Sequence, residues 1–231
     1  MFNRKNFYKP DIKAYSSKSA YLVSKADSPI AKISDIYIMD GFRIGYYSEI
    51  TSLFIDLRDS TYLSINDEKK YFQTISTIFQ IAIEETGLKE GFVDNFIGDA
   101  VLSVFMGKGQ NKKALDAAIR VRNRLKAESE RQSKGEDGFR VGIGIECGKA
   151  FIGTFDNYFQ SETCVIGVPT NVSFKIQACF SKNWEIAIGQ NFYKKNLDYI
   201  KSTVGTLGGS IEKKSEKVSK KLYLTSYIMS F

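Results

Sequence analysis

Residues 92–105 read FVDNFIGDAVLSVF, two apolar runs separated by the pair Gly98-Asp99. Each run has the length and the β-branched and aromatic content of a strand, and a glycine at the bend allows the backbone to reverse. The stretch therefore predicts a β-hairpin with Asp99 at its tip. A second unusual carboxylate, Asp56, ends the apolar run in LFIDLRDST (53–61). A carboxylate that follows an apolar strand is costly unless it is exposed, paired or bound to a cation.

The elements predicted around these two motifs alternate between strands and helices. The first elements in chain order are a strand at 50–55, a helix from Tyr71 to Gly87 after an N-cap signal at 64–68, the hairpin, and a helix at 113–130. A strand at 139–146, a glycine-containing turn with a further strand start at 147–155, and a strand at 163–166 come next. The last elements are a helix at 169–178, a strand at 185–188, and a Lys-rich hairpin at 213–221 with a final strand at 222–227. This β-α-β-β-α-β order, with a β-α-β continuation, predicts an α+β sheet of ferredoxin-like type with helices on one face. Residues 1–45 are interpreted as an N-terminal extension and 46–231 as the main domain.

The composition restricts the chemistry. The chain has 231 residues and no histidine, which excludes histidine general bases, Ser-His-Asp triads and histidine metal ligands. Any metal must be held by carboxylates and carbonyls, which favours Mg²⁺ or Mn²⁺. The net charge of +7 suits an anionic partner. Three cysteines without a CxxC pair, no apolar leader and no run of membrane-spanning length predict a cytoplasmic protein that does not cross a membrane.

Topology brings the two carboxylates together. In a βαββ arrangement, the end of the first strand and the tip of the following hairpin lie side by side, so Asp56 and Asp99 are expected to face each other. Two such carboxylates repel, a divalent ion removes the repulsion, and two ions can bridge phosphate oxygens and activate a hydroxyl group. The alternative is structural, with one Asp in a turn and the other capping a helix. The free N–H groups that open the next helix suit phosphate, and they belong to Arg58, Asp59, Ser60 and Thr61.

Four motifs, in order over about residues 48–227, resemble those of the class III nucleotidyl cyclases, the adenylyl and guanylyl cyclase homology domain. They are LFIDLRDST (53–61), FIGDAVLSVF (96–105), RVGIGIECGKAFIG (140–153), with Glu146 where the family usually has histidine, and VIGVPTNVSFKIQA (165–178). The resemblance implies a ferredoxin-like βαββαβ cyclase sheet with helices packed on it and extra βαβ and hairpin elements at the C-terminal end.

The resemblance also implies a reaction. Asp56 and Asp99, assisted by the carbonyl of Leu57, would hold two Mg²⁺ or Mn²⁺ ions. The ribose 3′-hydroxyl of a nucleoside triphosphate would attack the α-phosphorus, giving a 3′,5′-cyclic monophosphate and pyrophosphate.

Sites of this family are shared between the subunits of a dimer, which implies a homodimer. Asn171 is expected to orient the ribose, and Lys175 stands where the family has a transition-state arginine. A lysine of the late hairpin, Lys213 or Lys214, would match a phosphate-binding lysine. The structural alternative is that Asn171 caps a helix and that Lys175 is a solvated helix residue.

The resemblance implies that the base is read at the positions of Asn95 and Cys164. Asn95 fits neither the adenine-selective nor the guanine-selective pattern, and its amide matches the donor and acceptor edge of a pyrimidine. Phe54, Tyr62 and Phe96 are expected near the site, where they would fill the volume of a second purine ring. A pyrimidine cyclase is therefore expected, with UTP weakly preferred to CTP and GTP as the next candidate. Within the family, the chain most resembles the free-standing pyrimidine cyclases of bacterial anti-phage signalling. This resemblance implies that the product is a second messenger in anti-phage defence that switches on a separate effector.

The sequence leaves three alternative functions. The first is a guanylyl or adenylyl cyclase. The second is a degenerate cyclase-fold module that binds nucleotide or a partner without catalysis, for which the departures at Lys175, Asn95 and Asp59 argue. The third is a nucleic-acid-binding domain, which rests on net charge alone. No helix presents a basic face with interleaved aromatic residues, so no nucleic-acid partner is expected.

Overall fold

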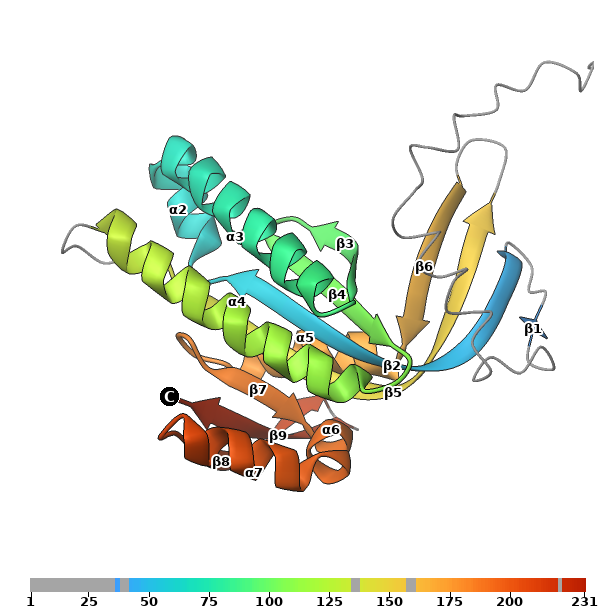
Figure 1. Cartoon of the computed structure of the whole chain (residues 1–231). Coiled ribbons are helices and arrows are strands. Elements are labelled where there is room, and N and C mark those ends of the chain that lie inside the picture. Colours follow the sequence, from blue (N-terminus) through green and yellow to red (C-terminus); the bar gives the residue numbers. More distant parts are fainter. Residues whose placement is uncertain (1–35, 38–41, 134–137, 157–160, 220–221) are drawn as a thin grey trace, which may run out of the picture.

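The computed structural model describes residues 36–37, 42–133, 138–156, 161–219 and 222–231 (Figure 1). The strands are β1 (Ile36–Tyr37), β2 (Phe42–Leu57), β3 (Phe92–Ile97), β4 (Ala100–Met106), β5 (Val141–Asp156), β6 (Ser161–Gly167), β7 (Ile186–Gly189), β8 (Ser210–Ser219) and β9 (Leu222–Ser230). The helices are α2 (Ser60–Asn66), α3 (Glu68–Leu88), α4 (Gln110–Ser133), α5 (Val168–Phe180), α6 (Gln190–Lys195) and α7 (Leu197–Thr206). Residues 1–35 lie outside the described residues, and residues 42–45, expected in the extension, are the start of β2.

The described strands form one mixed sheet with β2 near its centre. The main path is β3-β4-β2-β5-β7-β9-β8, with β1 added beside β2 and β6 beside β5. β2 runs antiparallel to both β4 and β5, whereas β5 and β7 are parallel. The α+β class and the βαββαβ order are therefore confirmed.

The turn expected at 147–155 is not present. β5 continues without interruption from Val141 to Asp156. Its first half pairs with β2 and β7, and its second half pairs with β2 and β6. Pairing on both edges supplies partners for the backbone N–H and C=O groups, and this outweighs the local turn preference of the glycines.

Helices cover both faces of the sheet, so the prediction of helices on one face was wrong. Successive side chains of a strand point to opposite faces. Leu53 and Ile55 of β2 share one core with apolar residues of α3, α4, α6 and α7. Ser52 and Asp56 point the other way, where α5 lies and forms a separate apolar cluster with β7 and β9. Figure 1 shows α3 and α4 crossing the first of these faces.

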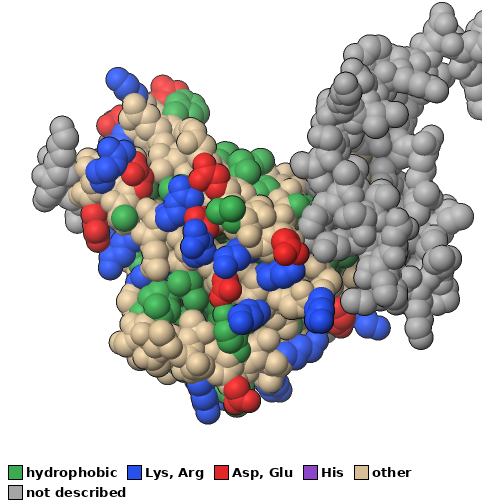
Figure 2. All heavy atoms as spheres, in the orientation of Figure 1, with side chains coloured by type: hydrophobic (Ala, Val, Ile, Leu, Met, Phe, Trp, Pro, Cys, Tyr) green, Lys and Arg blue, Asp and Glu red, His purple; other side chains and the backbone are tan. Residues whose placement is uncertain are grey.

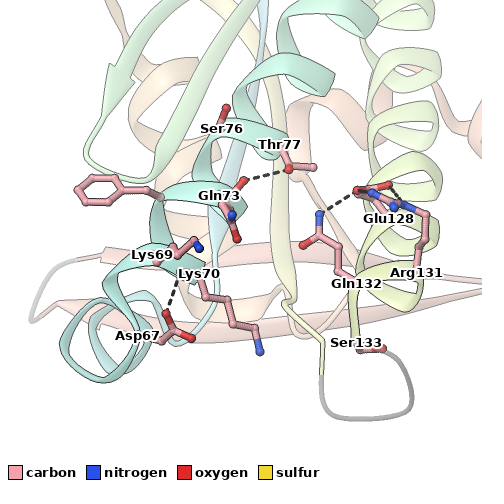
Figure 3. Close-up of a pocket in the computed structure, with 11 residues that line it drawn as sticks. Asp67, Lys69, Lys70, Gln73, Ser76, Thr77, Glu128, Arg131, Gln132 and Ser133 are labelled. Carbon is pink, nitrogen blue, oxygen red and sulfur yellow. Dashed lines mark hydrogen bonds and ion pairs between the residues drawn. The ribbon is translucent and has the colours of Figure 1, made fainter.

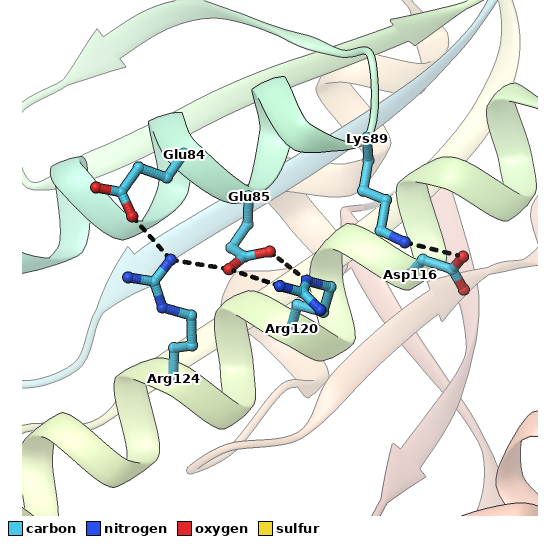
Figure 4. A network of polar contacts seen from close by, with 6 residues as sticks. All are labelled: Glu84, Glu85, Lys89, Asp116, Arg120 and Arg124. Atoms are coloured by element: carbon cyan, nitrogen blue, oxygen red, sulfur yellow. Dashed lines mark hydrogen bonds and ion pairs between the residues drawn. The ribbon is translucent and has the colours of Figure 1, made fainter.

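A charged network joins α3 to α4 (Figure 4). Glu85 is 1% exposed, and both its carboxylate oxygens accept hydrogen bonds from Arg120 and Arg124. Lys89, which directly follows α3, forms a further ion pair with Asp116 of α4, at 3.5 Å. On the surface over these two helices, acidic and basic side chains are interspersed (Figure 2). The network fixes the packing of the two helices.

Candidate active site

The structure brings Asp56 and Asp99 together at one end of β2. Asp56 pairs with Ala100, the residue that follows Asp99 in the hairpin. The hairpin turns at Gly98, whose φ of +62° lies in the left-handed region that favours glycine. A Cβ at Gly98 would meet only open space, so the tip of the hairpin is accessible to a ligand.

The two carboxylates differ in their protein partners. Asp56 Oδ2 accepts a hydrogen bond from Gln177 Nε2 at 2.9 Å and lies 3.6 Å from Nη1 of Arg58. Burial, and then the charge of Asp99, raise the pKa of Asp56, although Gln177 and Arg58 act in the opposite direction. Asp99 Oδ2 is shielded from solvent and has no hydrogen-bond partner among the described residues. A buried carboxylate oxygen without a donor is costly, and a cation would remove that cost.

This donor set fits a hard divalent cation. Carboxylate oxygens are the ligands that Mg²⁺ and Mn²⁺ prefer, and the unpartnered Asp99 oxygen sits beside a second carboxylate. The described residues contain no cluster of three or more Asp, Glu, Cys or His side chains, so the pair needs substrate, water or backbone oxygens to complete a coordination sphere. Leu57 directly follows Asp56, and the role of its carbonyl stays a prediction.

The segment after Asp56 begins α2, as expected. Asp59 precedes the helix with a left-handed φ of 57°, and its carboxylate pairs with Arg140 at 3.1 Å. Ser60 and Thr61 form the first turn of the helix. The backbone N–H of Arg58 donates to the carbonyl of Arg140 at 2.8 Å. Phosphate binding by this segment stays a prediction, and its backbone N–H at Arg58 is already bound within the chain.

The Arg58 guanidinium is directed toward α5. Nη2 donates to the carbonyls of Gln177 and Ser181, at 2.7 and 2.6 Å. Gly142 makes this position possible, because a Cβ there would lie 1.6 Å from Nη2. Arg58 therefore joins the end of β2 to the last turn of α5.

Asn171 and Lys175 lie one turn apart on α5, Asn171 exposed and Lys175 half-buried. Residues four apart share one side of a helix. Ser173 and Gln177 form the opposite side and contact Ser52 and Asp56 of β2. The structure thus places Asn171 and Lys175 away from the carboxylates of their own chain.

The two candidate base-reading residues lie beside different parts of the long strand β2. Asn95 is exposed on β3 opposite Leu102, whose partner on β2 is Phe54. Cys164 is half-buried on β6 opposite Gly153, whose partner on β2 is Gly45. Within the sheet they are not neighbours, and base reading stays a prediction for both.

The three aromatic residues expected near the site have separate surroundings. Phe54 is buried and meets Phe174 of α5 edge-on, with ring centroids 5.1 Å apart. Phe96 packs on Phe79 of α3 at 4.5 Å, and Tyr62 is largely exposed on α2. Of the three, Phe54 lies on the same strand and the same face as Asp56.

The lysines of the late hairpin lie on β8. Lys213 and Lys214 pair with Tyr227 and Ser226 of β9, and Lys214 forms an ion pair with Glu212 at 3.1 Å. β8 is the last strand of the main path, so both lysines stand at an edge of the sheet. Phosphate binding by either lysine stays a prediction.

Glu146, which stands where the family usually has histidine, is buried and hydrogen-bonded within the fold. It is 3% exposed, and its carboxylate accepts hydrogen bonds from the backbone N–H groups of Cys147, Phe192 and Asn191. The last two N–H groups belong to the first turn of α6, which leaves such groups without helical partners. Burial nevertheless raises the pKa of Glu146.

A groove of about 1000 Å³ lies between the N-terminal half of α3 and the C-terminal end of α4 (Figure 3). It is lined by Asp67, Lys69, Lys70, Phe72, Gln73, Ser76, Thr77, Glu128, Arg131, Gln132 and Ser133. Hydrogen bonds from Arg131 and Gln132 lower the pKa of Glu128 to about 2. None of the expected site residues lines this groove, so the carboxylate pair and not the groove defines the candidate site.

The chain is similar to known adenylyl and guanylyl cyclases in sequence or in fold. The sequence is 34% identical over 137 residues to an adenylate cyclase of Anabaena cylindrica, a match that covers 55% of this chain and 26% of that protein. The chain thus spans about a quarter of the length of this relative. A crystal structure of a guanylyl cyclase superposes with a TM-score of 0.68 and 18% identity, over 80% of this chain and 93% of that one.

The adenylyl cyclase CyaB from P. aeruginosa superposes with a TM-score of 0.67 and 20% identity, over 81% of this chain and 96% of that one. No protein-family model matches the sequence. The chain therefore shares the fold of these adenylyl and guanylyl cyclase structures, and part of its sequence is similar to an adenylate cyclase. None of the described helices combines the length and apolar character needed to cross a membrane.

Proposed function

We propose that this protein is a nucleotidyl cyclase that converts a nucleoside triphosphate into a 3′,5′-cyclic monophosphate and pyrophosphate. The observation that carries the proposal is the Asp56–Asp99 pair on a cyclase fold, with one buried Asp99 oxygen that has no hydrogen-bond partner among the residues the structure describes. Two divalent cations at this pair would favour ionisation of the ribose 3′-hydroxyl and neutralise the triphosphate. Asp56 and Asp99 would bind these cations, and Gly98 leaves the adjacent turn open to the substrate.

The proposed enzyme is a homodimer with shared sites. Asn171 and Lys175 face away from Asp56 in their own chain and are free to approach the carboxylates of a second copy. Exposed apolar residues on and beside α5, Ile166, Val168 and Phe174, suit such an interface. Mixing Asp56→Ala protein with Asn171→Ala protein is expected to restore one working site per heterodimer. Activity that stays absent after demonstrated subunit exchange would contradict the shared site.

Two classes of base are candidates. The similar proteins are named as adenylyl and guanylyl cyclases, so a purine triphosphate, ATP or GTP, is the better supported substrate. The residues at the expected base-reading positions favour the second candidate, a pyrimidine. Asn95 offers a donor and an acceptor where a purine-selective member would have lysine or glutamate. An anti-phage role and a separate effector would follow only from the pyrimidine case and depend on it.

An assay with equal concentrations of ATP, GTP, CTP and UTP in the presence of Mn²⁺ tests both points. One cyclic monophosphate is expected to dominate, and its base decides between the candidates. The Asp56→Ala protein is the matched control and is expected to form no product. If the folded dimer formed no cyclic product from any of the four, the degenerate nucleotide-binding module would replace the enzyme. The departures at Lys175, Asn95 and Asp59 favour that outcome, and at position 175 lysine lacks the bidentate fork of arginine.

A further inference from the structure

Gln177 makes a contact with the candidate metal site that the motifs do not assign. It lies on the buried side of α5, and its Nε2 donates to Asp56 Oδ2 at 2.9 Å. Its Oε1 is also buried and has no hydrogen-bond partner among the described residues. A buried amide oxygen without a donor destabilises the folded state. Packing alone would therefore favour an apolar residue at position 177.

The position of Gln177 is fixed from two directions. Arg58 Nη2 donates to the backbone carbonyl of Gln177 at 2.7 Å, which holds this turn of α5 above the end of β2. The helix can approach the sheet because β5 has glycine below it. A Cβ at Gly144 would lie 2.1 Å from the carbonyl of Ser173 and 2.7 Å from Cβ of Gln177.

The contact leaves the second oxygen of Asp56 for a ligand. The Gln177 amide donates a hydrogen bond to Oδ2 of Asp56, and Nη1 of Arg58 lies 3.6 Å from the same oxygen. Hydrogen bonds of this kind orient a metal-binding carboxylate, and their loss typically lowers metal affinity by about 10- to 100-fold. The carboxylate would otherwise be able to rotate toward Arg58 and away from Asp99.

We propose that Gln177 is a positioning residue that holds Asp56 in the orientation needed to bind a divalent cation together with Asp99. This inference rests on the metal site of the proposed function and adds a residue that sets its affinity. The amide is retained at a buried position despite its unpartnered oxygen because Asp56 needs the N–H donor.

The test measures Mn²⁺ binding to the full 231-residue chain, without nucleotide, by the loss of the electron paramagnetic resonance signal of free Mn²⁺. Gln177→Met keeps the volume of the side chain and removes both polar atoms. We expect Mn²⁺ affinity to fall by about 10-fold, with little change in Tm, because removal of the unpartnered Oε1 offsets the loss of the donor to Asp56. Ser173→Ala is the matched control, because Ser173 lies one turn earlier on the same side of α5 but contacts Ser52. Its Mn²⁺ affinity is expected to stay within about twofold of wild type.

The outcomes separate this inference from the proposed function. If wild type binds Mn²⁺ no better than Asp99→Asn, both the metal site and the positioning role are overturned. If wild type binds through the Asp pair but Gln177→Met binds equally well, the positioning role alone fails. A lower Tm with unchanged Mn²⁺ affinity would show a purely structural role for Gln177. Gln177→Leu provides the same readout if Gln177→Met does not fold.

Discussion

Two regions of this protein place carboxylates beside arginine, but the carboxylates differ in how fully they are hydrogen-bonded. At the α3–α4 interface, both oxygens of Glu85 accept hydrogen bonds from Arg120 and Arg124 (Figure 4). At the end of β2, Asp56 has one arginine at 3.6 Å, and Asp99 has a buried oxygen without a hydrogen-bond partner in the described part of the chain. The carboxylate of the first region is fully hydrogen-bonded within the chain, whereas the second region lacks a donor or cation, which residues 42–133, 138–156, 161–219 and 222–231 do not supply.

The difference separates a structural carboxylate from a functional one. A buried charge that contributes to the fold is paired and hydrogen-bonded. Glu146 also follows this rule, since backbone N–H groups surround it although it stands at a motif position. Incomplete pairing of Asp99, rather than the presence of an acidic residue, marks the candidate site. Exchanging single carboxylates for amides tests this distinction.

The largest expected effect is that of Asp99→Asn. Cations at such a site supply several kcal/mol of transition-state stabilisation, so cyclase activity should fall by at least about 100-fold. Stability without metal should be unchanged or higher, because the repulsion between Asp56 and Asp99 is removed. Product formation and urea unfolding in the presence of a chelator measure the two effects. A protein that lost stability while retaining activity would reverse the assignment of Asp99.

Glu85→Gln should give the opposite pattern. The amide keeps the shape of the side chain but removes the charge that Arg120 and Arg124 share. A hydrogen bond to a charged group is worth about 1.5–3 kcal/mol when well formed, and partial exposure of the arginines reduces this to about 1–2 kcal/mol for the replacement. Activity below the unfolding temperature should stay within about twofold of wild type. A loss of activity at full folding would show that α3 and α4 influence the site.

The parts of the fold that were predictable are specified by nearby residues. The β3–β4 hairpin follows from two strand-forming runs around Gly98, which takes a left-handed φ of +62°. The start of α3 follows from the N-cap signal at residues 64–68. The side chain of Asp67 accepts a hydrogen bond from the backbone N–H of Lys70 at 2.9 Å. In both cases the decisive contact spans only a few residues.

The features that were not predicted depend on distant partners. The glycines of β5 indicate a turn when considered alone, but they lie in a strand that is paired on both edges. The same is true of α5, whose buried side carries polar residues beside its apolar ones and makes hydrogen bonds with Ser52 and Asp56 of β2. Helical periodicity shows that such a helix forms, but not which face of the sheet it covers.

The candidate site also has one part that the sequence predicts and one part that depends on contacts between distant residues. The adjacency of Asp56 and Asp99 was predictable, because βαββ topology places a strand end beside a hairpin tip. The contact between Gln177 and Asp56 joins residues 121 positions apart and has no local signal. One indication was present, since glycines at 142 and 144 alternate with core residues and show that something packs closely against that face of β5.

The smallest expected effect is a difference in the pH dependence of stability between the two regions. Burial acts to raise the pKa of Glu85, but the hydrogen bonds from Arg120 and Arg124 outweigh it, so the folded pKa lies below the ordinary value of 4.5. Glu85 therefore stabilises the fold above that pH, and the contribution is lost as the pH falls through the lower folded pKa. For Asp56 the sign is opposite, because its folded pKa is raised above 3.8. Its charged form destabilises the metal-free fold at neutral pH, and protonation removes the penalty as the pH falls.

Urea unfolding of Glu85→Gln and Asp56→Asn, from about pH 7 to about pH 3 with a chelator present, measures both contributions against wild type. Glu85→Gln should be less stable than wild type at pH 7 and approach it at low pH. Asp56→Asn should be more stable than wild type at pH 7 and lose that advantage at low pH. Parallel curves for the two variants would mean that both carboxylates are equally well paired, and the distinction between the two regions would fail.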